Sequence, residues 1–121
     1  MKHRKQAFEL IERTISWNNV RGNTPSTLDW KLETDMLQEE LNELVDASTL
    51  VDRFDALLDL QFVLLGSLSK MGLTAEQIVD GYEAVMQANE TKSSTKNGAG
   101  KITKPLDFVG PEAKLQQILE P

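Results

Sequence analysis

The sequence contains no cysteine and only one histidine, His3, in 121 residues. Without cysteine, neither a disulfide framework nor a thiolate metal site can form, which is compatible with the reducing cytoplasm where we expect the protein. A single histidine also excludes a di-iron carboxylate bundle, because that kind of site uses Glu-x-x-His motifs on two helices. A metal site made by residues other than His3 would therefore use oxygen ligands.

Long hydrophobic runs and a basic surface are also missing. The longest apolar run is interrupted at Gln61 and is far shorter than the roughly 20 residues of a membrane span, so no membrane contact is expected. The charged N-terminal stretch MKHRKQAFEL lacks the apolar segment of a signal peptide. A net charge of −6 argues against nucleic-acid binding, which usually shows a basic surface. The length favours a single domain over residues 1–121.

The charged residues are segregated along the chain. Residues 29–59 hold ten acidic residues against only Lys31 and Arg53, whereas residues 91–104 hold four lysines and no acid. An acidic cluster and a separate basic loop in one small protein suit a ligand that carries both a cation and phosphates. On charge alone, a solvated helix face and a disordered tail are the favoured interpretation.

Hydrophobic periodicity predicts helices throughout, because no segment shows the sustained alternation of a half-buried strand. We expect five helices, at about 3–17, 27–47, 50–70, 74–89 and 112–119. Ser26 or Thr27 is the expected cap of the second helix, Gly72 ends the third, and the fourth runs from Thr74 to near Asn89. The predicted fold is all-α: a four-helix-type bundle over a core of residues 3–90, with an irregular lysine-rich tail over residues 91–121.

The expected third helix has apolar residues on nearly all sides between Leu57 and Leu65. A helix without a solvent face of its own lies in the centre of a bundle or in a subunit interface. A chain with four main helices has too little material to cover it, so the sequence predicts a dimeric core, in a homodimer or a dimer of dimers.

Carboxylates interrupt the apolar pattern of the two central helices. Glu40 and Glu43 share a face with Met36 and Ala47 on one of them, while Asp55 and Asp59 lie four residues apart on the next. If the two helices pack antiparallel, these acids can face one another. Such an oxygen-ligand site suits hard divalent cations, Mg²⁺ first and Mn²⁺ next. The alternative is that the glutamates are solvated and Asp55 pairs with Arg53 or a lysine.

Three motifs occur in order: Glu39-Glu40-x-x-Glu43, then DALLDL at residues 55–60, then Ala88-Asn89-x-x-Lys92. This pattern resembles the all-α nucleoside triphosphate pyrophosphohydrolases, the MazG-like group that includes phosphoribosyl-ATP pyrophosphohydrolase. The resemblance spans about residues 29–109. The second motif of this group is commonly E-x-x-D, and Ala56 stands at the position of its glutamate, so we expect Asp55 to substitute.

The resemblance implies a Mg²⁺-dependent hydrolase that converts (deoxy)nucleoside triphosphates to the monophosphate and pyrophosphate, in nucleotide-pool housekeeping. It implies catalytic roles for Glu40 and Glu43, and a metal site made of Glu40, Glu43, Asp59 and Asp55. Substrate phosphates are expected to contact Asn89, Lys92, Lys101 and Lys104. Two alternatives remain open: a phosphoribosyl-ATP pyrophosphohydrolase-type activity, and a non-catalytic helical dimer that acts as an interaction module.

Overall fold

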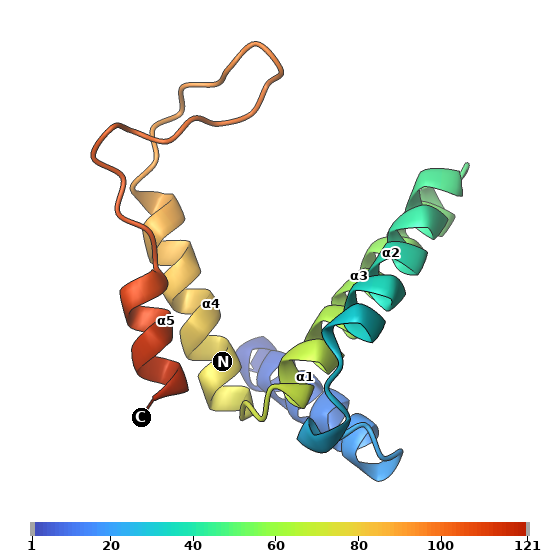
Figure 1. Cartoon of the computed structure of the whole chain (residues 1–121). Helices are drawn as coiled ribbons and strands as arrows, with labels where there is room; N and C mark the ends of the chain where they lie inside the picture. The colour runs from blue at the N-terminus through green and yellow to red at the C-terminus, as the bar shows by residue number, and fades with distance from the viewer. Residues whose placement is uncertain (1, 121) are drawn as a thin grey trace. The chain divides into compact units, whose positions relative to one another are not determined.

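The computed structural model describes residues 2–120, and all regular elements in this range are helices apart from one isolated bridge between Lys96 and Ile102. In chain order these elements are α1 (Lys2–Val20), the 3-10 helix η1 (Pro25–Thr27), α2 (Trp30–Asp46), α3 (Leu50–Lys70), α4 (Ala75–Glu90) and α5 (Glu112–Leu119) (Figure 1). The all-α prediction is confirmed. The chain divides into two compact units, Met1–Ala75 and Glu76–Pro121, which are described separately below.

The start of α2 differs from the prediction. Thr27 does not cap a helix, because its backbone N–H and its hydroxyl both donate to the Thr24 carbonyl and close the short turn of η1. Asp29 is the cap instead, and its carboxylate accepts a hydrogen bond from the Lys31 N–H at 3.0 Å. The cap predicted at Ser26 or Thr27 was therefore wrong, since Pro25 starts a separate turn before α2.

The first unit consists of α1, η1, α2 and α3, with α3 in contact with each of the others. Trp17 of α1 meets Phe62 of α3 edge-on, with ring centroids 5.0 Å apart. One turn further along α3, Gly66 lies against the buried side chain of Asn18, so that a Cβ at this glycine would lie 3.4 Å from the amide nitrogen. The small residue lets α1 and α3 approach closely.

The ends of α3 are set as the sequence indicates. Thr49 caps its start by accepting a hydrogen bond from the Asp52 N–H at 3.1 Å. Only three residues separate the end of α2 from the start of α3. Gly72 follows the last turn with a φ of +84°, a backbone conformation that glycine adopts without strain. The short connection makes α2 and α3 an antiparallel helical hairpin, which is the arrangement that a shared acidic site on these helices requires.

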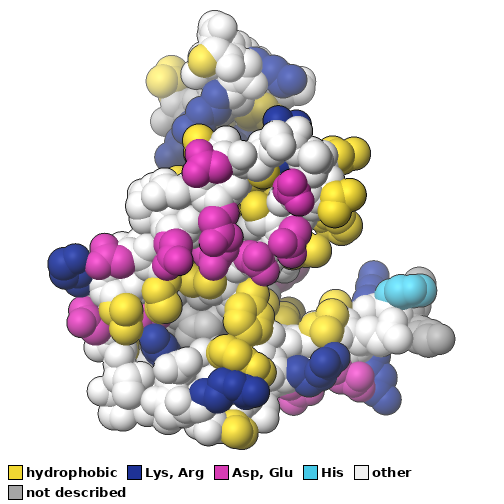
Figure 2. Space-filling model, turned by 90° about the vertical axis from the view of Figure 1, so that its right-hand side faces the viewer, with side chains coloured by type: hydrophobic (Ala, Val, Ile, Leu, Met, Phe, Trp, Pro, Cys, Tyr) yellow, Lys and Arg dark blue, Asp and Glu magenta, His cyan; other side chains and the backbone are white. Residues whose placement is uncertain are grey.

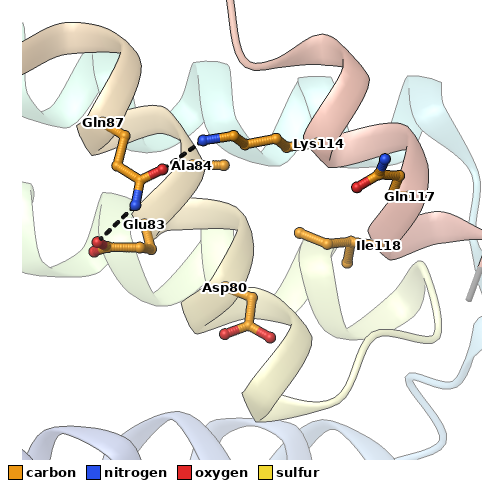
Figure 3. Close-up of a pocket in the computed structure, with 7 residues that line it drawn as sticks. All are labelled: Asp80, Glu83, Ala84, Gln87, Lys114, Gln117 and Ile118. Atoms are coloured by element: carbon orange, nitrogen blue, oxygen red, sulfur yellow. Dashed lines mark hydrogen bonds between the residues drawn. The ribbon is translucent and has the colours of Figure 1, made fainter.

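The second unit consists of α4, the segment 91–111 and α5. Figure 1 shows this segment as a long irregular loop that extends beyond the ends of the two helices. Gln77 of α4 donates to the Ile118 carbonyl at 3.2 Å, and Lys114 of α5 donates to the Gln87 side chain at 2.6 Å (Figure 3). These bonds hold α5 along α4.

The sequence pattern predicts an inward face of α4 made of Ile78, Tyr82, Val85 and Met86, and the structure confirms this face only in part. Ile78 is buried, but Tyr82 is 66% exposed and Met86 is 38% exposed, so the expectation that both point inward was wrong. Small residues occupy the covered positions instead: Ala84 and Ala88 are buried, and Gly81 lies against Leu115 of α5. The sequence pattern misled because it weighted large apolar residues over alanine and glycine.

Within residues 2–120, no single helix has both the length and the apolar character of a membrane span. In this range, the pair α3 and α4, taken as one bent segment, has the length and apolar composition of a span, but the core helices of soluble proteins can have them too.

Candidate active site

Three carboxylates from α2 and α3 come together in the first unit. Glu40 and Glu43 lie one turn apart on α2, and Asp59 lies opposite on α3. One carboxylate oxygen of each lies within 4.8 Å of those of the other two. None of the three side chains is buried, so an ion from solvent can reach them. We call these residues the carboxylate cluster. Figure 2 shows acidic side chains gathered in a band on this part of the molecule, with hydrophobic side chains next to it.

Glu40 is the most constrained member of the carboxylate cluster. Its Oε2 atom is buried and has no hydrogen-bond partner among the described residues. Burial raises the pKa of Glu40, and the hydrogen bond and negative charge of Glu43 raise this pKa further, followed by the charges of Asp59 and Glu39. The cluster therefore requires either a proton or an external cation.

Among the side chains that the structure describes, no cation is paired with the carboxylate cluster. The two ion pairs of the described residues, Lys31–Asp35 and Lys70–Glu33, both lie toward the start of α2 and use no member of the carboxylate cluster. Three carboxylates in reach of one another, with no positive side chain paired to them, form a suitable donor set for a hard divalent cation. The donor chemistry therefore fits Mg²⁺ or Mn²⁺.

Asp55 lies one turn before Asp59 on α3 and outside the group of oxygens within 4.8 Å. It is exposed, and with Glu43 it lines an open depression of about 320 Å³ that also contains Asp46 and Asp52. Glu43 thus borders both the carboxylate cluster and this depression. Direct ligation by Asp55 stays a prediction.

The lysine candidates belong to the second unit, where two of them converge on one ring. The ammonium of Lys92 lies 5.4 Å from the centroid of Phe108, and that of Lys104 lies 5.3 Å from the same centroid. Two lysines that are twelve residues apart in the sequence therefore contact the same aromatic ring. The aromatic face offsets part of the repulsion between them.

The other two substrate-binding candidates lie differently. Lys101 is exposed near the far end of the loop, where its backbone N–H and C=O both bond to Asn97. The side-chain amide of Asn89 donates to the Val85 carbonyl at 2.9 Å, within α4. That bond leaves the Asn89 carbonyl oxygen and one amide hydrogen for a ligand. Roles for Asn89 and Lys101 stay predictions.

One group of polar residues in the first unit was not anticipated. Glu33 of α2 is 1% exposed, and its carboxylate accepts a hydrogen bond from the Ser67 hydroxyl at 3.0 Å and one from the Lys70 ammonium at 3.1 Å. We call Glu33, Ser67 and Lys70 the buried trio. The signal that could have revealed it is the spacing, because Glu33 lies seven residues before Glu40 and thus on the same face of α2.

An all-helical chain with a carboxylate cluster across an antiparallel helix pair has the features of the MazG-like, all-α nucleoside triphosphate pyrophosphohydrolases. Within this superfamily, the model of the phosphoribosyl-ATP pyrophosphohydrolase family matches residues 10–89, and the chain belongs to that family. The match includes the carboxylate cluster, Asp55 and Asn89 but ends before the three lysines. Comparison with curated proteins and with solved structures gives no match. Family membership supports a pyrophosphohydrolase activity on a nucleotide phosphoanhydride.

Proposed function

We propose that this protein hydrolyses a nucleoside triphosphate between its α- and β-phosphates, with Mg²⁺ as cofactor, and releases the monophosphate and pyrophosphate. The observation that carries the proposal is the carboxylate cluster, in which Glu40 has a buried, unpartnered oxygen. A role in nucleotide-pool housekeeping and a cytoplasmic location are part of the same proposal.

The carboxylate cluster is the proposed ion site, with Asp55 as a further ligand. When bound, Mg²⁺ supplies Lewis-acid polarisation of phosphate oxygens and neutralises their charge. Mn²⁺ has similar ligand preferences and can replace it.

Glu40 and Glu43 are the proposed catalytic residues. Each carboxylate has two oxygens, so an oxygen of Glu40 that does not hold the ion can accept a proton from the attacking water. The water oxygen forms a bond to the α-phosphorus, the bond from this phosphorus to the bridging oxygen breaks, and pyrophosphate leaves with the electron pair. Glu43 is exposed beside Glu40 and orients the same water.

Lys92, Lys101 and Lys104, with Asn89, are the proposed contacts to substrate phosphates. The support comes from the second unit alone, where Lys92 and Lys104 present two charges over Phe108. Ammonium groups stabilise phosphate charge by charge-assisted hydrogen bonds.

The second candidate is hydrolysis of phosphoribosyl-ATP, which the name of the matched family favours. A panel of canonical and modified nucleoside triphosphates, together with phosphoribosyl-ATP, distinguishes the two. Each compound is incubated with the protein and Mg²⁺, and pyrophosphate release is scored. Turnover of a triphosphate above that of phosphoribosyl-ATP supports the first proposal. Release from phosphoribosyl-ATP alone overturns it in favour of the second, and no release from any compound favours the interaction module.

We also propose that a second copy of the chain covers the hairpin of α2 and α3. What supports this is the exposure of large apolar side chains on α3, where Leu50, Val51 and Phe54 are 82%, 76% and 65% exposed. On α2, Val45 is 74% exposed. Exposed apolar residues in such number on one hairpin are typical of an interface between subunits.

Sedimentation at micromolar concentration tests the second copy. We expect a dimer or a dimer of dimers, and we expect Phe54→Ser to shift the protein toward the monomer because it places a hydroxyl in an apolar contact. The matched control is Val20→Ser, which replaces a residue that is 79% exposed at the end of α1. A stable monomer of the unchanged chain contradicts this proposal.

A further inference from the structure

The buried trio and the carboxylate cluster lie on the same two facing helix stripes. Along α2, Glu40 and Glu43 follow Glu33 by seven and ten residues. Along α3, Asp59 precedes Ser67 by eight residues and Lys70 by eleven. In an antiparallel pair these intervals cover nearly equal lengths, so both sets of contacts belong to one register of α2 against α3.

The stripe on α2 has heptad spacing, with Glu33, Met36, Glu40, Glu43 and Ala47 separated by three and four residues in turn. The facing stripe on α3 has nearly the same spacing, at positions 56, 59, 63, 67 and 70, and includes Ser67 and Lys70, which bond to Glu33. The apolar and small residues of these stripes have no preferred partner at a given level, because hydrophobic contact is not directional. They do not by themselves exclude a shift of one helix along the other.

The buried trio does exclude such a shift. Glu33 is 1% exposed, and the Lys70 side chain is 5% exposed. A slip by one turn, about 5.4 Å, would separate their charges inside the protein and leave each without a partner. A buried polar contact in a helical seam is known to fix register in this way. The same slip would take Asp59 away from Glu40 and Glu43.

We propose that Glu33, Ser67 and Lys70 are positioning residues that set the register of α2 against α3 and thereby hold the carboxylate cluster together. The effect on ion binding rests on the proposed ion site, whereas the effect on the register of α2 against α3 does not depend on it. It assigns a functional effect to three residues that touch neither the ion nor the substrate.

The test replaces the buried trio's charges by apolar groups of similar size, in the double variant Glu33→Leu/Lys70→Met. An apolar pair keeps the helices packed, so thermal stability is expected to be retained or increased. Directional pairing is lost, however, and the affinity for Mg²⁺, measured by calorimetry, should fall by about ten-fold, as when groups that orient metal ligands are removed. If the buried trio only stabilised the fold, a variant that keeps its thermal stability would also keep its affinity for Mg²⁺.

The register is measured directly with spin labels. The chain has no native cysteine, so Gln38→Cys and Gln61→Cys, both exposed and close to the level of the carboxylate cluster, take labels selectively. Labelled chains are diluted with unlabelled ones so that only distances within a chain are recorded. We expect one narrow distance in the parent chain and a broadened or second distance, displaced by up to about 5 Å, after Glu33→Leu/Lys70→Met.

Two outcomes decide the proposal. An unchanged narrow distance, or a Mg²⁺ affinity within two-fold of the parent, overturns it. If the parent binds no Mg²⁺ but the distance broadens, the buried trio still sets the register and the proposed function fails instead. The charge-exchanged variant Glu33→Lys/Lys70→Glu keeps a directional pair and should restore the narrow distance. Lys31→Met, which removes the exposed partner of Asp35, is the matched control and should change neither measurement.

Discussion

Two carboxylates on one face of α2 differ in what surrounds them. Glu33 is almost completely buried, and its oxygens are bonded to the Ser67 hydroxyl and the Lys70 ammonium. Glu40, seven residues further on, has a buried oxygen with no partner and two acidic neighbours. At the first position the chain supplies its own cation. At the second it supplies only more negative charge.

This difference separates a carboxylate that is paired within the fold from one that we propose to pair with an external ion. On α3, the positions three residues before and four residues after Asp59 hold Ala56 and Val63, where a lysine or arginine would have placed a positive charge beside the carboxylate cluster. The first unit thus contains an internal ion pair and, separate from it, an acidic group for which we propose an external ion. Substitutions at the two places should have opposite effects.

The largest expected effect is the loss of turnover in Asp59→Asn. Replacing this carboxylate removes a ligand from α3 that no other member of the carboxylate cluster can supply, so pyrophosphate release should fall to background. Asp55→Asn should lose activity less completely, because Asp55 lies outside the group of close oxygens. The control is Asp35→Asn, the same substitution at an exposed site on α2, which should retain full turnover. Full activity of Asp59→Asn would exclude the proposed site.

The next largest effect is expected on stability, at Glu33. Glu33→Gln leaves the Lys70 ammonium buried without an opposite charge, which should lower the free energy of unfolding by about 3 to 5 kcal/mol. Chemical denaturation measures this change. Asp35→Asn, which breaks the exposed ion pair with Lys31, should cost less than about 1 kcal/mol. Equal losses in the two variants would show that burial does not distinguish the pairs.

A smaller effect is expected from the lysines of the second unit. Lys92→Ala and Lys104→Ala should each lower kcat/KM about ten-fold or more, since a lost charge-assisted hydrogen bond is worth about 1.5 to 3 kcal/mol. Lys96→Ala, in the same loop but away from Phe108, is the control and should stay near the parent value. Similar losses at all three positions would point to general charge attraction instead of specific contacts.

The smallest effect is on the pH dependence of stability without divalent cations. The pKa of Glu40 is raised above its ordinary value of 4.5 in the folded protein, so the folded state holds a proton that the unfolded state has lost. Glu40 therefore destabilises the fold progressively as pH rises from about 4.5 through its folded pKa. The difference in unfolding free energy between Glu40→Gln and the parent should grow over this range in EDTA. It should shrink when Mg²⁺ is added, and a difference independent of pH would contradict the shift.

The sequence predicted the helices and the cluster because both depend on local periodicity. The limits of α3 follow from Thr49 and Gly72, and the spacing of Glu40 and Glu43 places both on the face that meets Asp59. The start of α2 was missed because Pro25 formed a turn of its own. The buried trio was missed because Glu33 and Lys70 are 37 residues apart, and their pairing becomes visible only once the register is known.

The most direct test of the distinction between the two regions is thermal unfolding of the parent and of Asp59→Asn, each in EDTA and in saturating Mg²⁺. In EDTA, Asp59→Asn should unfold at the same temperature as the parent or higher, because it relieves repulsion within the carboxylate cluster. Mg²⁺ should stabilise only the parent, by about 2.7 kcal/mol at a hundred-fold excess over Kd. A large loss of stability of Asp59→Asn in EDTA, or an equal Mg²⁺ effect on both chains, would contradict the account.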